Sequence, residues 1–532
     1  MQDSKNMILA IVLCLVVLFG WGRFAEYMGW VTPPAQQVAQ QATSAPQPLP
    51  AFIPAPGQDV TVHTPLYDAV IYNGGGILRS FNLLPYGTSL APDAPKVNMV
   101  SPQTAVMAPL GLVINGQPSW STGKWATETA VKNFSLEPGA RTTLHLIGEA
   151  DNFRIDRELA FSADSYLIHE TIHIRNPGDQ ARTMRLSYTA AADASNATDD
   201  RYDGMRIAWG KDSGLNEESS AKTLESTGVQ DSGRIFWAGA MSTYFLSAVV
   251  PDSPGGGMTV KARLQNNVYR AALEEPEITL EPGEDKTWAV SYWYGPKERS
   301  LLQSVSPELA KSIDLGMFSL IAKGLLWLLD IFNSWVHNWG VAIMLLTVLI
   351  KAVFWPLTAK SYSSMEKMKK LQPRMTALRD KYKDDKEQMN KEVMALYKTY
   401  GVNPASGCVP ILIQLPVFFG LYQALLTAIE LRHAPFITHL PFTDIIWLAD
   451  LSTKDPYYIT PVIMGLTMFL QQKMSPPAAD PTQQKVMMFL PLIFTVLFLG
   501  FPSGLVVYWL VNSILSIAQQ WRMIQKHNAV RA

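Results

Sequence analysis

The strongest constraint on how this chain can fold is the series of apolar segments that begins after residue 336. A transmembrane helix needs about 20 mainly apolar residues to cross roughly 30 Å of hydrocarbon. Val486–Gly500 has only 15 residues, which rise about 22 Å at ~1.5 Å per residue. We therefore expect helices that extend into flanking polar residues, or a bilayer that is thinner locally. The five predicted spans are Trp339–Leu357, Cys408–Ile429, Tyr457–Leu470, Val486–Gly500 and Gly504–Gln519.

One more apolar segment, Met7–Gly20, lies near the start of the chain behind Lys5. It is typical either of a cleaved signal or of an uncleaved anchor, and both export the polypeptide C-terminal to them. Bulky residues stand after it where a cleavage site would have small ones, which favours an anchor over residues 1–31. Residues 32–58 are rich in Pro, Gln and Ala, and we expect an extended linker there.

Residues 59–305 have the pattern of a large all-β domain. Apolar and polar residues alternate in Ile155–Phe161 and in Tyr166–Arg175, and turn sequences stand at 176–179 and 281–284. The only cysteines are Cys14 and Cys408, so this region can have no disulfide framework. Residues 59–299 carry 29 acidic and 21 basic side chains.

Residues 306–336 are predicted to contain an amphipathic helix, over Ser312–Trp335. Its polar residues fall on one helical stripe: Ser312, Ser319, Lys323 and Asp330. This pattern favours a helix that lies in the membrane interface. The alternative is a helix that packs on the core of the β domain.

The charges of the connecting segments predict the orientation. Residues 360–407 hold 11 basic and six acidic residues, which places this loop in the cytoplasm by the positive-inside rule. The basic residues of the C-terminus, including the tail 526–532, reach the same side after four more crossings, and the cation-poor loop 432–456 falls outside. The sequence thus predicts a polytopic α-helical membrane protein with six spans, both ends cytoplasmic and the β domain outside. Five of these spans form a core over residues 337–525.

The cytoplasmic loop 360–407 is predicted to form a helical hairpin. Apolar residues recur at spacings of three and four in both arms, which turn near 383–385. They are Met365, Met368, Leu371, Met375, Leu378 and Tyr382 in the first arm, and Met389, Val393, Leu396 and Tyr400 in the second. The alternative is a solvated hairpin that only links two spans.

Lys351 is an ionisable residue deep in the first core span. A charge at that depth costs at least about 2.5–3.5 kcal/mol, so it normally faces protein or water. No Asp or Glu lies deep in any predicted span, whereas hydroxyls and amides do, which favours a wet polar cavity with one cation. The alternative is snorkelling, because Leu357 at the inner end lies only about 9 Å away at ~1.5 Å per residue.

Composition and motifs exclude several function classes. The net charge of −1 argues against a protein that binds a specific nucleic-acid sequence. The chain has no G-x-x-x-x-G-K-[ST], H-E-x-x-H or G-x-S-x-G motif, so we expect no enzyme, no metal and no cofactor. Two alternatives stay open: a small-anion transporter that uses Lys351, and an anchored periplasmic carbohydrate-binding protein. Against an active β domain, His169 and Glu170 point to opposite faces of one strand.

Several motifs of the C-terminal part resemble the YidC/Oxa/Alb membrane protein insertases. They occur in order over about residues 310–525: Lys351–Lys370, Leu371-Gln372-Pro373, Asn403–Gly420, Gly465–Pro476 and Phe501–Leu505. A long exported β domain after one anchor resembles the Gram-negative YidC form. In that form the domain is a β-supersandwich, similar to mutarotase-like folds.

The resemblance implies an insertase and folding chaperone of the bacterial inner membrane, which acts alone or with the Sec translocon. It implies a hydrophilic groove, open to the cytoplasm and to the lipid bilayer, with one positive residue that is usually arginine and here is Lys351. It also implies that the hairpin receives nascent membrane proteins and contacts partners, including, transiently, the ribosome. The candidate groove residues are Lys351, Thr347, Gln414, Gln423, Thr467, Trp509, Asn512 and Ser513. The candidate hairpin residues are Met365, Met368, Gln372, Pro373, Met375, Tyr382, Met389 and Tyr397.

Overall fold

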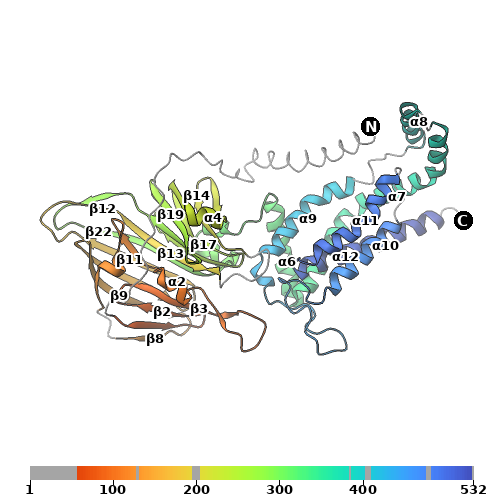
Figure 1. Cartoon of the computed structure of the whole chain (residues 1–532). Coiled ribbons are helices and arrows are strands. Elements are labelled where there is room, and N and C mark those ends of the chain that lie inside the picture. The colour runs from red at the N-terminus through yellow and green to blue at the C-terminus, as the bar shows by residue number, and fades with distance from the viewer. Residues whose placement is uncertain are drawn as a thin grey trace. The chain divides into compact units, whose positions relative to one another are not determined.

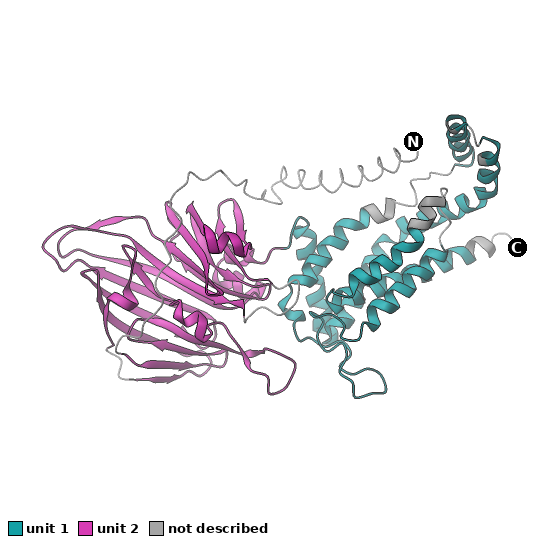
Figure 2. Cartoon of the chain, in the orientation of Figure 1, with its two compact units in different colours: residues 1–31, 315–532 teal, residues 32–314 magenta. Residues whose placement is uncertain are grey.

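The computed structural model describes residues 57–127, 131–194, 204–382, 385–401, 409–474 and 481–529. Of these, the residues up to Asp314 form one unit and those from Leu315 onward form another (Figure 2). The predicted anchor 1–31 and the linker before Gly57 lie outside the described residues. So do part of the predicted hairpin turn, at 383 and 384, and residues 530–532 of the predicted tail.

The unit that ends at Asp314 is built from β-sheets, as the alternating pattern predicts (Figure 1). Its largest sheet has nine strands, and in sheet order these are β15 (Gly214–Glu218), β14 (Arg206–Lys211), β17 (Ile235–Met241), β18 (Phe245–Pro251), β22 (Asp285–Pro296), β11 (Leu167–Arg175), β10 (Phe153–Ser162), β9 (Arg141–Ala150) and β7 (Lys124–Thr127). The predicted strands over 155–161 and 166–175 are confirmed as β10 and β11. The predicted turn at 281–284 is also present, with Gly283 at φ 77°.

Three smaller sheets complete this unit. The six-stranded sheet has the order β16 (Val229–Gly233), β19 (Met258–Gln265), β20 (Val268–Glu274), β13 (Leu186–Asp193), β5 (Leu112–Ile114) and β6 (Gln117–Pro118). The five-stranded sheet has the order β4 (Lys96–Asn98), β3 (Ile77–Gly87), β2 (Tyr67–Tyr72), β1 (Asp59–His63) and β8 (Asn133–Ser135). The last sheet pairs β12 (Arg182–Met184) with β21 (Ile278–Leu280).

The core of the β unit lies between layers of sheet. β17 and β18 of the nine-stranded sheet pack against β20 and β13 of the six-stranded sheet. Short helices occupy connections between strands and the end of the unit: α2 (Pro102–Val106), α3 (Ser119–Thr122), α4 (Ala221–Ser226), α5 (Arg299–Val305) and the 3₁₀ helix η2 (Leu309–Ser312). Two facing sheets with apolar inner faces form one dry core.

A fully buried ion pair crosses the inner face of the nine-stranded sheet. Arg157 on β10 pairs through its Nε with Glu170 on β11, and both side chains are 0% exposed. Arg157 Nη1 donates to Gly76 O at 3.0 Å, and Nη2 donates to Leu110 O at 2.7 Å. The hydroxyl of Tyr292 on β22 donates to Glu170 Oε2 at 2.9 Å, and burial together with the charge of Glu170 raises the pKa of Tyr292 well above its ordinary value. Both charges of this buried pair therefore have several partners, as a charge in a low-dielectric core requires.

The second unit is helical. It consists of α6 (Ser319–Val336), α7 (Trp339–Lys381), α8 (Lys386–Thr399), α9 (Val409–Thr427), the 3₁₀ helix η4 (Ile429–Leu431), α10 (Ile459–Met474), α11 (Pro481–Phe498) and α12 (Ser503–Ala529). α7 is one helix of 43 residues with Pro356 and Pro373 inside it, so the first core span and the first arm of the hairpin are continuous. The described ends of the two arms, Lys381 and Lys386, bracket the predicted hairpin turn.

The amphipathic helix differs from the prediction at its start. The sequence predicts a helix from Ser312, but α6 begins only at Ser319, and Ser312 ends η2 with its side chain buried. Between them Gly316 has a φ of 66°, a left-handed conformation that interrupts helical hydrogen bonding. The predicted stripe through Ser312 is therefore wrong, while Lys323 and Asp330 are exposed on α6.

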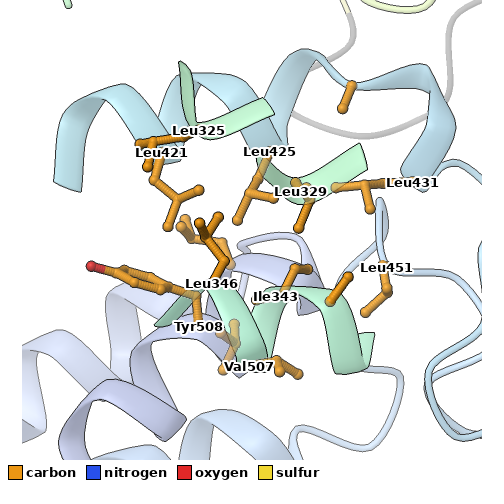
Figure 3. Close-up of a cluster of buried hydrophobic side chains, with 14 of the residues drawn as sticks. Leu325, Leu329, Ile343, Leu346, Leu421, Leu425, Leu431, Leu451, Val507 and Tyr508 are labelled. Carbon is orange, nitrogen blue, oxygen red and sulfur yellow. The ribbon is translucent and has the colours of Figure 1, made fainter. Parts of the chain in front are cut away.

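α6 packs on α7 and α9, so it belongs to the helical unit and not to the core of the β domain. Apolar side chains from these three helices, from α12, from η4 and from the loop before α10 meet in one cluster (Figure 3). The labelled members are Leu325, Leu329, Ile343, Leu346, Leu421, Leu425, Leu431, Leu451, Val507 and Tyr508. On α6, α7 and α9 the spacings of three and four place these residues on one face of each helix.

The outward faces of the helical unit are also apolar. On α11, the side chains of Leu492, Ile493 and Val496 are 61%, 59% and 62% exposed. An apolar surface of this kind suits lipid and not water. By length and composition, two helices among the described residues could cross a membrane, α6 and the part of α7 up to Leu378. The placement of α6 in the interface therefore stays a prediction.

A polar loop joins α9 to α10, and its side chains and backbone form hydrogen bonds at the starts of α10 and α12. Asp455 Oδ2 accepts hydrogen bonds from the backbone N and the hydroxyl of Thr460 at 2.7 and 2.8 Å, next to the start of α10. Asp450 O accepts from the hydroxyl of Ser503, the first residue of α12, at 2.9 Å. The loop thus ties α10 and α12 together at one end. His433 Nε2 approaches Asp450 Oδ2 at 3.8 Å within it.

We expect Arg157→Met to destabilise the β unit by about 3–5 kcal/mol, because Glu170 then stays buried without its counter-charge. Urea unfolding of the full chain in detergent, followed by tryptophan fluorescence, measures this. Arg79→Met is the matched control, because Arg79 pairs with Asp59 at the surface and such a pair contributes about 0–1 kcal/mol. An equal loss in both variants would contradict the assignment of Arg157 to the core.

We expect the helical unit to lose stability in acid through His433. Burial and the nearby Arg432 lower its pKa, while Asp450 acts in the opposite direction. Because the folded-state pKa lies below the unfolded value of about 6.5, the stabilisation is present above that value and is lost as the pH falls through the folded pKa. His433→Asn should reduce the drop in melting temperature between pH 8 and pH 5.

Asparagine is chosen because His433 has a φ of 59°, a conformation that asparagine tolerates. His337→Asn is the control, since His337 is an exposed histidine with a φ of 51°. Identical pH curves for the wild type and both variants would show that His433 does not contribute.

Candidate functional site

The candidate site is a line of polar side chains between α7, α10 and α12, which we call the polar seam. Its members are Thr347, Lys351, Thr358, Tyr362, Gln471, Asn512, Ser513, Ser516 and Gln519. α12 packs along both α7 and α10. On α7 the spacings of four, seven and four from Thr347 to Tyr362 keep these residues on one helical face. The seam therefore results from helical periodicity in otherwise apolar segments.

Lys351 lies at the centre of the polar seam. Its side chain is 9% exposed, and its Nζ donates to Ser516 Oγ at 2.7 Å. Ser516 in turn donates to the backbone carbonyl of Asn512 at 2.7 Å. The hydroxyl of Tyr362 forms hydrogen bonds with Ser516 and with Gln471. The hydroxyls of Ser516 and Tyr362 together thus link the cation to all three helices.

The polar seam continues further along α7 and α12. Gln519 Nε2 donates to Thr358 Oγ1 at 2.6 Å and to Trp355 O at 3.4 Å. This contact sets the register of the two helices: Thr358 is seven residues after Lys351, and Gln519 is three residues after Ser516. Ser516 therefore lies about four residues, or ~6 Å at ~1.5 Å per residue, further toward the C-terminal ends of the helices than Lys351.

This register distinguishes the two interpretations of Lys351. The lysine stem runs toward the predicted inner end of its helix, as in snorkelling. Its ammonium nonetheless stays inside the protein, because it stops at Ser516 and the residue is 9% exposed. In the described part of the chain no carboxylate pairs with Lys351, so the charge is held by a neutral hydroxyl.

Three other predicted groove residues lie along the polar seam. Thr347 is 1% exposed, one turn before Lys351, and its hydroxyl donates to Ile343 O at 2.7 Å. Asn512 accepts the proton of Ser516 through its backbone carbonyl. Ser513 is 2% exposed on α12. These residues and Lys351 come from two adjacent helices.

The remaining four predicted groove residues lie elsewhere. Gln423 on α9 packs near Gly316, before the start of α6. Thr467 on α10 donates to Met464 O of its own helix at 2.7 Å. Trp509 belongs to an aromatic cluster, with its ring centroid 4.8 Å from that of Phe418. Gln414 is partly buried on α9. Among the described residues, the Lys351 ammonium donates a hydrogen bond to Ser516 on α12.

The hairpin of α7 and α8 has a small apolar core of its own. Met375 and Tyr397 are buried there with Leu371, and Met368 packs against them. The hydroxyl of Tyr397 donates to Met375 Sδ at 3.4 Å. The other predicted hairpin residues surround this core: Met365, Gln372, Tyr382 and Met389 are partly buried, and Pro373 is exposed.

A basic hollow opens between the two arms of the hairpin, with a volume of about 330 Å³. It is lined by Lys367, Lys370, Leu371, Arg374 and Tyr400. The guanidinium of Arg374 lies over the Tyr400 ring, 5.1 Å from its centroid. Three cations around one hollow suit an anionic partner. Within the described ranges, no group of three His, Cys, Asp or Glu side chains could hold a metal ion.

The residues that hold Lys351, Ser516 and Tyr362, are not among the predicted groove residues. Ser516 is visible in the sequence as a hydroxyl one turn after Asn512, but nothing there distinguishes it from Ser513. Tyr362 lies at the start of the charged hairpin segment, and no feature of the sequence marks it as a partner of Lys351 or Ser516. The contact depends on how α7 and α12 are aligned, which the local pattern does not determine.

Comparisons with known proteins cover both units. Residues 59–328 match the family model of the YidC periplasmic domain, and residues 331–530 match that of the 60Kd inner membrane protein. The membrane protein insertase YidC of Nitratidesulfovibrio vulgaris strain DP4 is 52% identical over 99% of this chain and 100% of its own length. The membrane protein insertase YidC of Lawsonia intracellularis is 48% identical, over 99% of this chain and 100% of its own length.

A crystal structure of an active YidC insertase, with its first transmembrane domain resolved, is also similar to this chain. It is 20% identical, with a TM-score of 0.36, over 88% of this chain and 94% of that one. The family models and the full-length relatives confirm the resemblance drawn from the motifs. The chain belongs to the YidC family of membrane protein insertases, in the form that carries a periplasmic domain.

Proposed function

We propose that this insertase lowers the barrier for the polar flank of a nascent membrane protein by receiving it at the polar seam around Lys351. One observation carries the proposal: Lys351 is buried, and its hydrogen-bond partner is the neutral hydroxyl of Ser516. The positive charge is therefore not compensated by a carboxylate of the described chain. An acidic segment of a substrate can supply that counter-charge.

The chemistry needs no covalent step and no nucleotide. An ammonium has three donors, and Ser516 uses one of them. The others can bind a carboxylate, which lowers the cost of bringing that carboxylate out of water. Because lysine is a point charge and lacks the planar fork of arginine, we propose electrostatic attraction and not bidentate binding.

We propose that the apolar part of the substrate leaves along α9 and α11. Both helices present large apolar side chains outward, among them Ile413 and Phe419 on α9 and Leu492 and Val496 on α11. Transfer of an apolar segment from water to lipid along such a surface is favourable. The transfer of the apolar segment into lipid then drives insertion, after the polar seam has received the polar flank of the substrate.

We propose that the hairpin makes the first contact with the nascent chain and with cytoplasmic partners. Its exposed Met394 and its basic hollow offer an adaptable apolar contact and an anionic-partner site on one small element. The ribosome and the Sec translocon are the partners we propose, with contact to the ribosome transient.

We propose six spans with both termini in the cytoplasm, and a β-supersandwich in the periplasm. The support is the charge distribution, with a basic hairpin on one side and an acidic β domain on the other. A periplasmic domain on a membrane insertase implies the bacterial inner membrane. Because the chain belongs to this insertase family, we set aside the two alternatives, a small-anion transporter and an anchored carbohydrate-binding protein.

We expect Lys351→Glu to slow insertion of a single-span substrate with an acidic N-terminal tail by about tenfold or more, because a buried like charge costs at least ~1.4 kcal/mol. The measurement is protease protection of the substrate in proteoliposomes that contain the full chain. Lys323→Glu is the matched control, since it makes the same charge change at an exposed site on α6. Unchanged insertion with Lys351→Glu would sink the electrostatic part of the proposal.

We expect Tyr397→Ala to reduce crosslinking between the hairpin and a ribosome-bound nascent chain severalfold. The substitution removes a buried ring, which costs about 3–5 kcal/mol and disrupts the small core with Met375. Met394→Ala on the same helix is the control, because Met394 is 58% exposed. Equal crosslinking in both variants, with the hairpin of Tyr397→Ala newly sensitive to protease, would show that a folded hairpin is not needed for capture.

A further inference from the structure

We infer that Ser516, supported by Tyr362, is the residue that positions the Lys351 ammonium for an acidic substrate. The inference rests on the proposed function, because it assigns the residue that orients the Lys351 ammonium in the polar seam. Ser516 does not itself touch the substrate. It acts through Lys351, as a positioning residue.

The hydrogen bonds around Ser516 leave its hydroxyl no freedom. Its single proton goes to Asn512 O at 2.7 Å. Its oxygen therefore acts as an acceptor toward Lys351 Nζ at 2.7 Å, and the Tyr362 hydroxyl bonds to the same side chain. A hydroxyl has one proton and two lone pairs, so these three contacts account for all of them.

This arrangement fixes both ends of the Lys351 contact. Because the proton of Ser516 is committed to its own helix, the oxygen presents only lone pairs to the ammonium. A lysine stem is flexible and would otherwise extend toward water beyond the end of its helix. Ser516 intercepts it about four residues, or ~6 Å, along the helix axis. The ammonium is thereby kept inside the polar seam with two donors left for a guest.

Tyr362 gives Ser516 a second constraint from outside its own helix. Tyr362 is on α7, eleven residues after Lys351, and its hydroxyl also bonds to Gln471 on α10. The three helices α7, α10 and α12 thus share one chain of hydrogen bonds that ends at the ammonium. Loss of the Ser516 hydroxyl should release the lysine without removing its charge, whereas loss of the Tyr362 hydroxyl removes only the second constraint on Ser516.

The test compares two substrates that differ only in whether the N-terminal tail carries Asp or Asn. The full chain is reconstituted in proteoliposomes, and the insertion rate of the Asp substrate is divided by that of the Asn substrate. We expect Ser516→Ala to lower this ratio about tenfold, as loss of a hydrogen bond to a charged group does. We expect Tyr362→Phe to lower it less, because Lys351 keeps its bond to Ser516.

Ser516→Thr is the conservative variant, which restores the hydroxyl and should return the ratio to within about twofold of the wild type. Ser334→Ala is the matched control, since the hydroxyl of Ser334 bonds only to Ile331 O within α6 in the described contacts. A second readout is acylation of Lys351 by a water-soluble amine reagent, measured by mass spectrometry. It should be faster in Ser516→Ala, where the amine relaxes toward water.

A purely structural role for Ser516 would lower insertion of both substrates equally and leave their ratio unchanged, and that result overturns the inference. The variant Lys351→Ala distinguishes failure of this inference from failure of the proposed function. If Lys351→Ala abolishes the ratio and Ser516→Ala keeps it, the inference alone is wrong. If Lys351→Ala also keeps it, the electrostatic mechanism is wrong. Should Ser516→Ala not fold, an unchanged ratio in Tyr362→Phe with unchanged Lys351 acylation overturns the inference instead.

Discussion

A buried charge must be hydrogen-bonded, and in the described part of the helical unit the hydroxyl of Ser516 is the partner of Lys351. The rest of the unit is arranged around that contact. α12 must run beside α7 at a register that brings Ser516 to the ammonium, and α10 must approach closely enough for Gln471 to reach Tyr362. The apolar cluster on the other faces of α7 and α12 holds this register in place. In this unit apolar packing holds a polar contact in place. In the core of a soluble protein, polar contacts usually support the apolar packing instead.

The β unit solves the same problem in the opposite way. Arg157 is completely buried, but Glu170 and two backbone carbonyls neutralise and saturate its guanidinium. Such a pair is closed to any further partner. Lys351 has a neutral partner, so its charge stays available. Arg157 and Lys351 therefore differ in consequence: the first holds sheets together, and the second is the charge to which we propose that a substrate binds.

The sequence predicted the parts of the fold that local periodicity encodes. Strict alternation located β10 and β11, and spacings of three and four located the faces of the hairpin that bury Met375. It failed where a single residue interrupts a pattern, as Gly316 does before α6. It also failed where function depends on the register between helices. Lys351 was identifiable as a charge in an apolar segment, whereas Ser516 gains its importance only from the alignment of α12 with α7.

The length of α7 has a mechanical consequence. One helix of 43 residues carries both Lys351 and the first arm of the hairpin, with no loop between them. A helix is stiff except where its hydrogen-bond ladder lacks a donor, and α7 lacks one at Pro356 and another at Pro373. One break in the ladder thus stands at Pro356, five residues beyond the lysine, and the other at Pro373, inside the arm of the hairpin. The proposed capture element and the residue that carries the buried charge therefore share one backbone, with one break in the hydrogen-bond ladder on each side of their junction.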